Sequence, residues 1–186
     1  LWYDTGNNGV KPHFGGTSTI VYDCETKSTI RQFQSLLGTD RNCAGGPTPW
    51  GTWVTCEEPE SKELVLPRWQ EKHGYCFEVR PTLEPELQKA VPIRAMGRFR
   101  HEAIAIDQDS NQVFLTEDHA DGLFYRFLPN EAQNLQAGGK LEALVIPNLR
   151  GAHTASGIPV GKRLKVEWIE MDGVTAPKND LRIRGK

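Results

Sequence analysis

The sequence lacks long hydrophobic runs and lacks an excess of basic residues. Its apolar stretches are short, such as Thr19–Tyr22 and Ala103–Ile106, and none approaches the ~18 residues that a membrane-spanning helix needs. Lysine and arginine number 22 against 24 acidic residues, so the formal net charge is -2. No basic stripe is present to neutralise the phosphates of a nucleic acid. We therefore expect neither a membrane span nor a nucleic-acid partner.

Several catalytic and cofactor-binding motifs are also absent. The sequence has no G-x-S-x-G nucleophile elbow, no P-loop and no dinucleotide-binding fingerprint. The cysteines Cys24, Cys43, Cys56 and Cys76 do not form a close-spaced zinc pattern such as C-x-x-C. Cys56 and Cys76 lie in two segments that we expect to be neighbouring strands. They therefore either form a disulfide or remain two small buried thiols.

The two ends of the chain resemble the interior of a longer protein. Leu1–Asp4 has no initiator methionine and no leader, and Leu181–Lys186 has no closing element. A length of 186 residues is enough for one domain with a core, or for part of a larger domain. We expect residues 1–186 to be part of a single domain that is incomplete at both ends.

The pattern of hydrophobic residues predicts an all-β chain, because helical periodicity over ten or more residues is nowhere convincing. Two segments, Gly38–Gly46 and Pro59–Lys72, are expected to be loops, and Glu84–Ala90 is expected to form at most one helical turn. The expected strands are Gly15–Asp23, Thr29–Leu36, Trp50–Glu57, Gly74–Arg80, His101–Asp107, Gln112–Thr116, Gly122–Leu128 and Leu141–Ile146.

One internal repeat indicates how these strands are arranged. Thr55–Glu58 is echoed by Leu115–Asp118, and each acidic pair is followed by a loop and a β run that closes with proline. The two β runs are Gly74–Pro81 and Gly122–Pro129. A repeated unit of several short strands is typical of a β-propeller, in which equivalent strand ends meet at one mouth of a central channel. The alternative is a β-sandwich with a chance similarity.

Acidic residues gather at the ends of the expected strands or beside glycine-rich bends, namely Glu57, Glu58, Glu102, Glu117 and Asp118. Carboxylates a few ångströms apart repel one another unless a cation lies between them. Hard cations such as calcium bind several carboxylate oxygens. The set therefore predicts a metal site, although any one of these acids alone is more often a solvated turn residue than a ligand.

Softer ligands and basic residues accompany these acids. Cys43 opens the glycine-rich bend before Trp50–Glu57, and Cys43 with His101 would suit iron or another transition metal. The alternative for Cys43 is a tight turn that leads into a buried strand. Arg41, Arg98 and Arg100 flank these motifs, so they either hold an anionic substrate with bidentate geometry or balance the charge of the carboxylates.

Three sequence blocks resemble those of the PhoX-type alkaline phosphatases. The first is Asn42–Glu58, with its Asn-Cys-Ala-Gly-Gly and Thr-Cys-Glu-Glu motifs. The others are Gly97–Ala103 and Leu115–Phe127. The resemblance runs from about Gly15 to Pro129 and is thin beyond it. It implies a β-propeller metalloenzyme that is exported to the periplasm or the extracellular space and that hydrolyses small phosphate monoesters.

The resemblance also implies iron and calcium ions at the channel mouth, held by Cys43, Glu58, Glu102 and Glu117. Glu57 and Asp118 are kept as further candidate ligands, and Arg41 and Arg100 as candidate catalytic residues. Because family chains are several times longer, we expect this chain to hold two to three blades of a six-bladed propeller. We also expect a monomer. The alternatives are a non-catalytic, calcium-stabilised binding module and a propeller esterase or lactonase.

Overall fold

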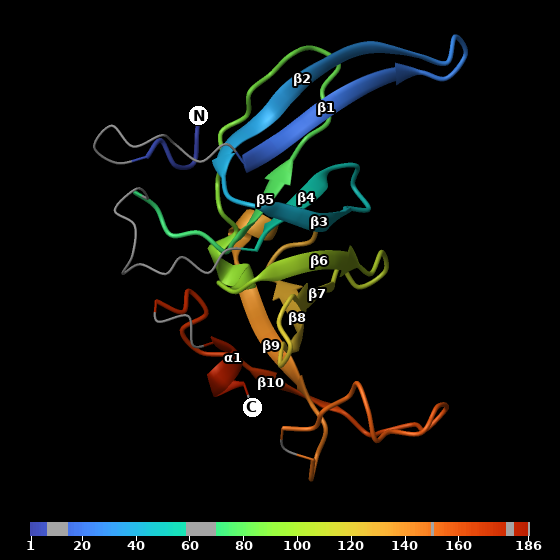
Figure 1. The fold of residues 1–186 in the computed structure, drawn as a ribbon, viewed down its shortest axis with the longest axis vertical. Helices are drawn as coiled ribbons and strands as arrows, with labels where there is room; N and C mark the ends of the chain where they lie inside the picture. Colours follow the sequence, from blue (N-terminus) through green and yellow to red (C-terminus); the bar gives the residue numbers. More distant parts are fainter. Residues whose placement is uncertain (7–14, 59–69, 150, 178–180, 186) are drawn as a thin grey trace.

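The chain folds into short strands with almost no helix, and the prediction of an all-β protein is confirmed (Figure 1). The computed structural model describes residues 1–6, 15–58, 70–149, 151–177 and 181–185, so most of the predicted loop Pro59–Lys72 lies outside the described residues. The strands are β1 Gly15–Asp23, β2 Ser28–Thr39, β3 Asn42–Pro47, β4 Trp53–Glu57, β5 Cys76–Val79, β6 His101–Ile106, β7 Val113–Glu117, β8 Phe124–Pro129, β9 Gly139–Val145 and β10 Glu167–Glu170. The short helices are two 3-10 turns, Arg94–Met96 and Leu135–Ala137, and α1 Leu181–Arg184.

Eight of the strands form one hydrogen-bonded sheet in the order β10-β9-β8-β7-β6-β3-β4-β5. It consists of two antiparallel meanders, the first meander β3–β5 and the second meander β6–β10. Their first strands, β3 and β6, lie side by side and parallel through the pair Gly45 and Ala103. Consecutive propeller blades meet in this way, since the inner strands of neighbouring blades line the central channel and run along it in the same direction. The structure thus confirms a propeller segment rather than two facing sheets.

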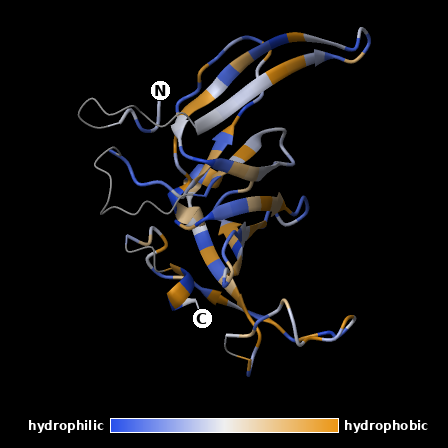
Figure 2. Ribbon diagram, in the orientation of Figure 1, coloured by the Kyte–Doolittle hydropathy of each residue, from blue (hydrophilic) through white to orange (hydrophobic). Residues whose placement is uncertain are grey.

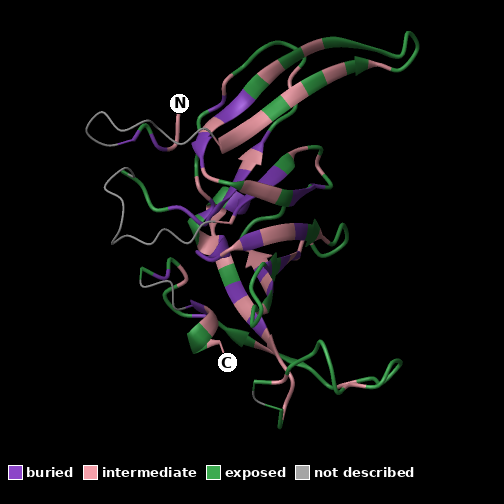
Figure 3. Cartoon of the chain, viewed as in Figure 1, coloured by how far each residue is buried: buried purple, intermediate pink, exposed green. Residues whose placement is uncertain are grey.

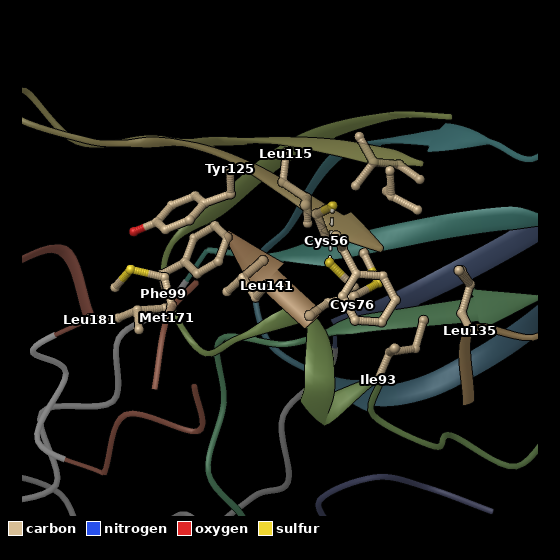
Figure 4. Close-up of a cluster of buried hydrophobic side chains, with 14 of the residues drawn as sticks. Cys56, Cys76, Ile93, Phe99, Leu115, Tyr125, Leu135, Leu141, Met171 and Leu181 are labelled. Atoms are coloured by element: carbon tan, nitrogen blue, oxygen red, sulfur yellow. Dashed lines mark hydrogen bonds between the residues drawn. The ribbon is translucent and has the colours of Figure 1, made fainter. Parts of the chain in front are cut away.

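The main core lies where the two meanders meet. It contains Val54 and Cys56 from the first meander, and Leu115 and Tyr125 from the second, all of them fully buried. Figure 4 shows side chains from both meanders packed together in this cluster. Hydrophobic and polar residues alternate along β9 (Figure 2), as expected for a strand with one face on this core.

The β1–β2 hairpin projects from one end of the molecule (Figure 1). Its residues nearest the body are buried, including Leu36 and Thr39, whereas the outer part around the turn is exposed (Figure 3). Leu36 belongs to a second, smaller core with Tyr75 and Phe77. The hairpin therefore rests on the first meander through its base.

One prediction of local structure is wrong. The expected loop Gly38–Gly46 is mostly strand, because Gly45 and Gly46 allow β3 to pack closely between its neighbouring strands. The segment Glu84–Ala90, expected to form at most one helical turn, forms none. There, the side chain of Gln88 accepts a hydrogen bond from the backbone N–H of Arg80 at 3.0 Å and donates one to its carbonyl at 2.7 Å. These bonds hold the segment in a non-helical conformation beside β5.

The helices of the described residues are all too short to cross a membrane.

Candidate metal centre

The sheet topology brings four strand ends to one place. β3 is antiparallel to β4, so the start of β3 at Asn42 lies opposite Glu57 at the end of β4. β3 is parallel to β6, so both of these strands start on the same side. β6 is antiparallel to β7, so His101 lies opposite Glu117. The acidic motifs at these ends therefore converge, as the repeat predicts.

Three side chains meet at this point: Cys43 of β3, Glu58 just after β4, and Glu102 of β6. Their ligand atoms all lie within 4.8 Å of one another, and each side chain is half-buried. The Cys43 thiol donates a hydrogen bond to Oε1 of Glu102 at 3.1 Å. This bond, with a contribution from burial, raises the pKa of Cys43 to about 11. The thiol therefore holds its proton until a cation replaces it.

Two glycines fix the position of Cys43 by allowing β3 to fit between β4 and β6. A Cβ atom on Gly45 would lie 2.1 Å from the carbonyl oxygen of Val54, and one on Gly46 would lie 2.3 Å from that of Ile104. Neither distance is possible for a real Cβ atom, so only glycine fits at these positions. A bulge between Cys43 and Gly46 accommodates the positive φ of Gly45.

The side chain of Asn42 anchors the start of β3. It accepts a hydrogen bond from Oγ1 of Thr39 at 2.7 Å and donates one to Oγ1 of Thr55 at 3.0 Å. These bonds tie the end of β2 and the middle of β4 to the residue before Cys43. The Asn-Cys motif thus places the thiol, and the asparagine itself is not in the cluster.

Arg100 lies between the cluster and the second acidic pair. Its Nη2 is 3.1 Å from Oδ2 of Asp118 and 3.9 Å from Oε2 of Glu58. Its Nε is buried and has no hydrogen-bond partner within the described part of the chain. The guanidinium of Arg100 thus lies between Glu58 and Asp118, and its Nε–H remains without an acceptor among the described residues.

The other two predicted arginines differ from Arg100. Arg41 is exposed, has a left-handed backbone at φ 42°, and its carbonyl accepts a hydrogen bond from the N–H of Glu58 at 3.3 Å. Arg98 is buried, and it donates hydrogen bonds to the carbonyls of His73 at 2.7 Å and Ala176 at 3.1 Å. These bonds hold Arg98 in the core through backbone carbonyls.

Glu57 points into the protein, away from the cluster that holds Glu58. Its carboxylate accepts hydrogen bonds from the backbone N–H groups of Gly74 at 2.8 Å, Tyr75 at 3.2 Å and Asp40 at 2.9 Å. It also contacts Nδ1 of His73 at 2.7 Å. Consecutive residues of a strand face opposite ways. The structure therefore brings Glu58, and not Glu57, to Cys43 and Glu102.

Glu117 is likewise occupied within the protein. Its carboxylate accepts hydrogen bonds from the N–H of Leu123 at 3.0 Å and the hydroxyl of Tyr125 at 3.2 Å, and it pairs with Arg182 of α1 at 2.9 Å. Glu117 is not part of the Cys43 cluster, and neither is Asp118, which contacts Arg100 at its edge. Among the predicted ligands, only Cys43, Glu58 and Glu102 lie together.

Sequence reasoning missed the charged partners of these buried acids. His73 lies between Glu57 and Asp4, with Nε2 at 3.2 Å from Oδ2 of Asp4, and all three side chains are fully buried. Arg182 of α1, far along the chain, is the cation beside Glu117. No local motif marks either partner: His73 lies 16 residues from Glu57 and 69 from Asp4, and Arg182 lies 65 residues from Glu117. The predicted soft ligand His101 is also elsewhere, fully buried beside Cys56 and Cys76.

A propeller segment with a thiol and two carboxylates at the meeting point of its inner strands belongs to the class of candidate metalloproteins. The sequence matches the family described as alkaline phosphatase PhoX over residues 14–184. The chain belongs to the PhoX alkaline phosphatase family.

Among solved structures, the chain is similar to Pseudomonas fluorescens PhoX in complex with vanadate, a transition state analogue. The sequence identity is 21% and the TM-score is 0.45. The match covers 72% of this chain and 31% of that chain, so this chain spans about a third of the Pseudomonas protein. No curated protein matches the chain.

Proposed function

We propose that this chain is the ligand-bearing part of a metal-dependent phosphomonoester hydrolase that uses iron and calcium. The observation that carries the proposal is the convergence of Cys43, Glu58 and Glu102 within 4.8 Å, in a member of the PhoX family. The proposed substrate is a small phosphorylated molecule. We also propose an exported, monomeric protein, in line with the family.

The donor set fits the proposed metals. A thiolate is a ligand for iron, and carboxylate oxygens suit both iron and calcium. Cys43 and Glu58 come from one meander and Glu102 from the other, so Cys43, Glu58 and Glu102 would hold ions at the junction of the two blades. When bound, such ions would polarise phosphoryl oxygens and activate an oxygen nucleophile.

Arg100 is the residue best placed to bind the phosphoryl group. Its guanidinium lies beside Glu58 and Asp118, and its buried Nε has no hydrogen-bond partner among the described residues. Asp118 orients the guanidinium, which can then offset the negative charge that develops in phosphoryl transfer. Arg41, which is exposed, is the second candidate for this role.

The test measures bound metals and phosphate release from a monoester, with the whole protein that carries this chain. We expect Cys43→Ala, Glu58→Gln and Glu102→Gln each to lose bound metal and to lower kcat/KM by at least about 100-fold. Cys24→Ala and Glu25→Gln change the same residue types in the exposed β1–β2 turn, and they should keep both metal and activity. A metal-free wild-type protein would contradict the proposal.

The two alternative functions give different results in the same experiment. A calcium-stabilised binding module would melt in a calcium-dependent way, with no iron and no turnover. An esterase or lactonase would hydrolyse carboxylic esters or lactones but not phosphate monoesters. Either result would replace the phosphatase proposal.

Arg100 and Arg41 are separated by a second comparison. We expect Arg100→Gln to lower kcat/KM for the monoester by about 100-fold while metal content stays unchanged. Arg41→Gln should have a smaller effect, because the side chain of Arg41 is exposed. An equal loss in both variants would assign the phosphoryl group to both arginines, and no loss in Arg100→Gln would remove Arg100 from the site.

A further inference from the structure

A second group of possible metal ligands lies inside the protein and is not part of the proposed catalytic cluster. Cys56 of β4, Cys76 of β5 and His101 of β6 place their ligand atoms within 4.8 Å of one another. All three side chains are fully buried, and both thiols are free. Figure 4 shows the sulfur atoms of Cys56 and Cys76 facing each other in the main core.

The imidazole of His101 has an unused nitrogen. Its Nε2 lies 3.1 Å from the carbonyl oxygen of Gly97, which can only accept, so Nε2 carries the proton. Nδ1 therefore has a lone pair, and it has no hydrogen-bond partner within the described part of the chain. A buried polar atom without a partner is costly, so its retention needs a reason.

The spacing of the two sulfur atoms suits a shared metal ion. The sulfurs are 3.6 Å apart. Two thiolates on a tetrahedral Zn²⁺, at about 2.3 Å each, are separated by about 3.8 Å. A disulfide requires about 2.05 Å, so it would require the two side chains to move together. The strand pairing sets this spacing, because Cys56 and Cys76 are directly opposite each other in β4 and β5.

The charge of such a site also suits its surroundings. Binding of Zn²⁺ would release one proton from each thiol, and two thiolates with a neutral imidazole would leave no net charge on the complex. An uncharged complex avoids the large cost of burying an unpaired ion among apolar side chains. The side chains around Cys56 and Cys76 belong to the hydrophobic core. A site lined by lysines or carboxylates would therefore leave an unpaired charge there.

We propose that Cys56, Cys76 and His101 form a buried structural site for a thiophilic cation of the Zn²⁺ class, distinct from the Cys43 cluster. The first two ligands belong to the first meander and the third belongs to the second. The ion would therefore link two consecutive blades from within. Within the sheet, the two blades are joined through the pair Gly45 and Ala103 of β3 and β6.

The test uses the whole protein that carries this chain, purified under reducing conditions with zinc. We expect Cys56→Ser and Cys76→Ser each to lose one equivalent of zinc and to lower Tm, while Cys24→Ser changes neither. Cys43→Ala should retain this zinc, which separates failure of this site from failure of the proposed catalytic centre. Loss of the same equivalent in Cys43→Ala would overturn the proposal.

Cys43→Ala protein, which keeps Cys56, Cys76 and His101 intact, provides a second measurement in case the core variants do not fold. Titration of metal-stripped Cys43→Ala protein with Co²⁺ should give thiolate-to-cobalt charge-transfer bands. Zn²⁺ should abolish these bands. Absence of thiolate–cobalt absorption would overturn the proposal. So would a Cys56–Cys76 disulfide that mass spectrometry finds in the protein as isolated, because the oxidised sulfurs cannot bind the ion.

Discussion

Glu57 and Glu117 occupy equivalent positions in the two meanders. Each is the buried last residue of a second strand, and each accepts a hydrogen bond from the backbone that leads into the third strand. Each also pairs with a cationic or protonatable side chain, His73 for Glu57 and Arg182 for Glu117. Their chain neighbours, Glu58 and Asp118, both face Arg100. The two acids of each pair thus have different roles. The first is buried and bonded within its own meander, and the second faces Arg100.

This division predicts unequal effects of neighbouring substitutions on the free energy of unfolding. Glu57→Gln should lower the free energy of unfolding by about 3 kcal/mol or more, because it removes the buried negative charge that His73 and three backbone N–H groups contact. Glu58→Gln should change it by no more than about 1 kcal/mol, because its pair with Arg100 is long and partly solvated. Urea unfolding of the metal-free protein measures both. A larger effect for Glu58→Gln would contradict the assignment.

The buried His73 predicts a loss of stability at high pH. Burial opposes its charge, but the hydrogen bond and charge of Glu57, together with Asp4, more than offset this, so the pKa of His73 is raised above 6.5. The folded state therefore binds the proton more tightly than the unfolded state does. The stabilisation is complete below pH 6.5 and is lost as the pH rises through the folded pKa.

The difference between wild type and His73→Gln isolates this effect. We expect the stability advantage of wild type in urea unfolding to shrink steadily above pH 6.5. His153→Gln, an exposed histidine variant, should parallel wild type at every pH. A difference between wild type and His73→Gln that grows with pH would show that His73 is neutral in the folded protein.

Glu102 should control the reactivity of Cys43. In metal-free protein, the raised pKa of about 11 leaves little thiolate at neutral pH, so alkylation of Cys43 should be slow and should accelerate towards that pH. Glu102→Gln removes the carboxylate whose hydrogen bond is the largest cause of the shift, and should accelerate alkylation at pH 8 by about tenfold. Peptide mass spectrometry follows Cys43, with exposed Cys24 as the internal reference. An unchanged rate would place Glu102 outside the thiol environment.

The two glycines of β3 should be intolerant of any side chain. Gly46→Ala places a Cβ atom 2.3 Å from the carbonyl oxygen of Ile104, so β3 and β6 must separate, and we expect a loss of several kcal/mol. Gly51→Ala is the control: it has φ 84° but nothing within 4 Å of the added atom, so it should cost about 1 kcal/mol of backbone strain. The urea midpoints compare the two. Equal losses would mean that the added Cβ atom of Gly46→Ala does not force β3 and β6 apart.

Local sequence patterns were sufficient for most strands and for the approximate place of the site. Alternation and turn residues locate β1, β6 and β7 within one or two residues. The acidic repeat pointed to the strand ends at the junction of the two blades, but of its four acids only Glu58 lies in the Cys43 cluster. The segment Glu84–Ala90 forms no helical turn, because the side chain of Gln88 is bonded to the backbone of Arg80 and overrides a weak local preference.

The sequence by itself determined the β class, the family blocks and the residue types that gather at the strand ends, because these depend on short-range patterns and motifs. Only the tertiary structure decided which acid of each pair faces the cluster, since that depends on register and on distant partners such as His73 and Arg182. It also separated His101 from the predicted site and placed it beside Cys56 and Cys76. Adjacent residues of one strand point to opposite sides, and only the packed sheets determine which side is the interior.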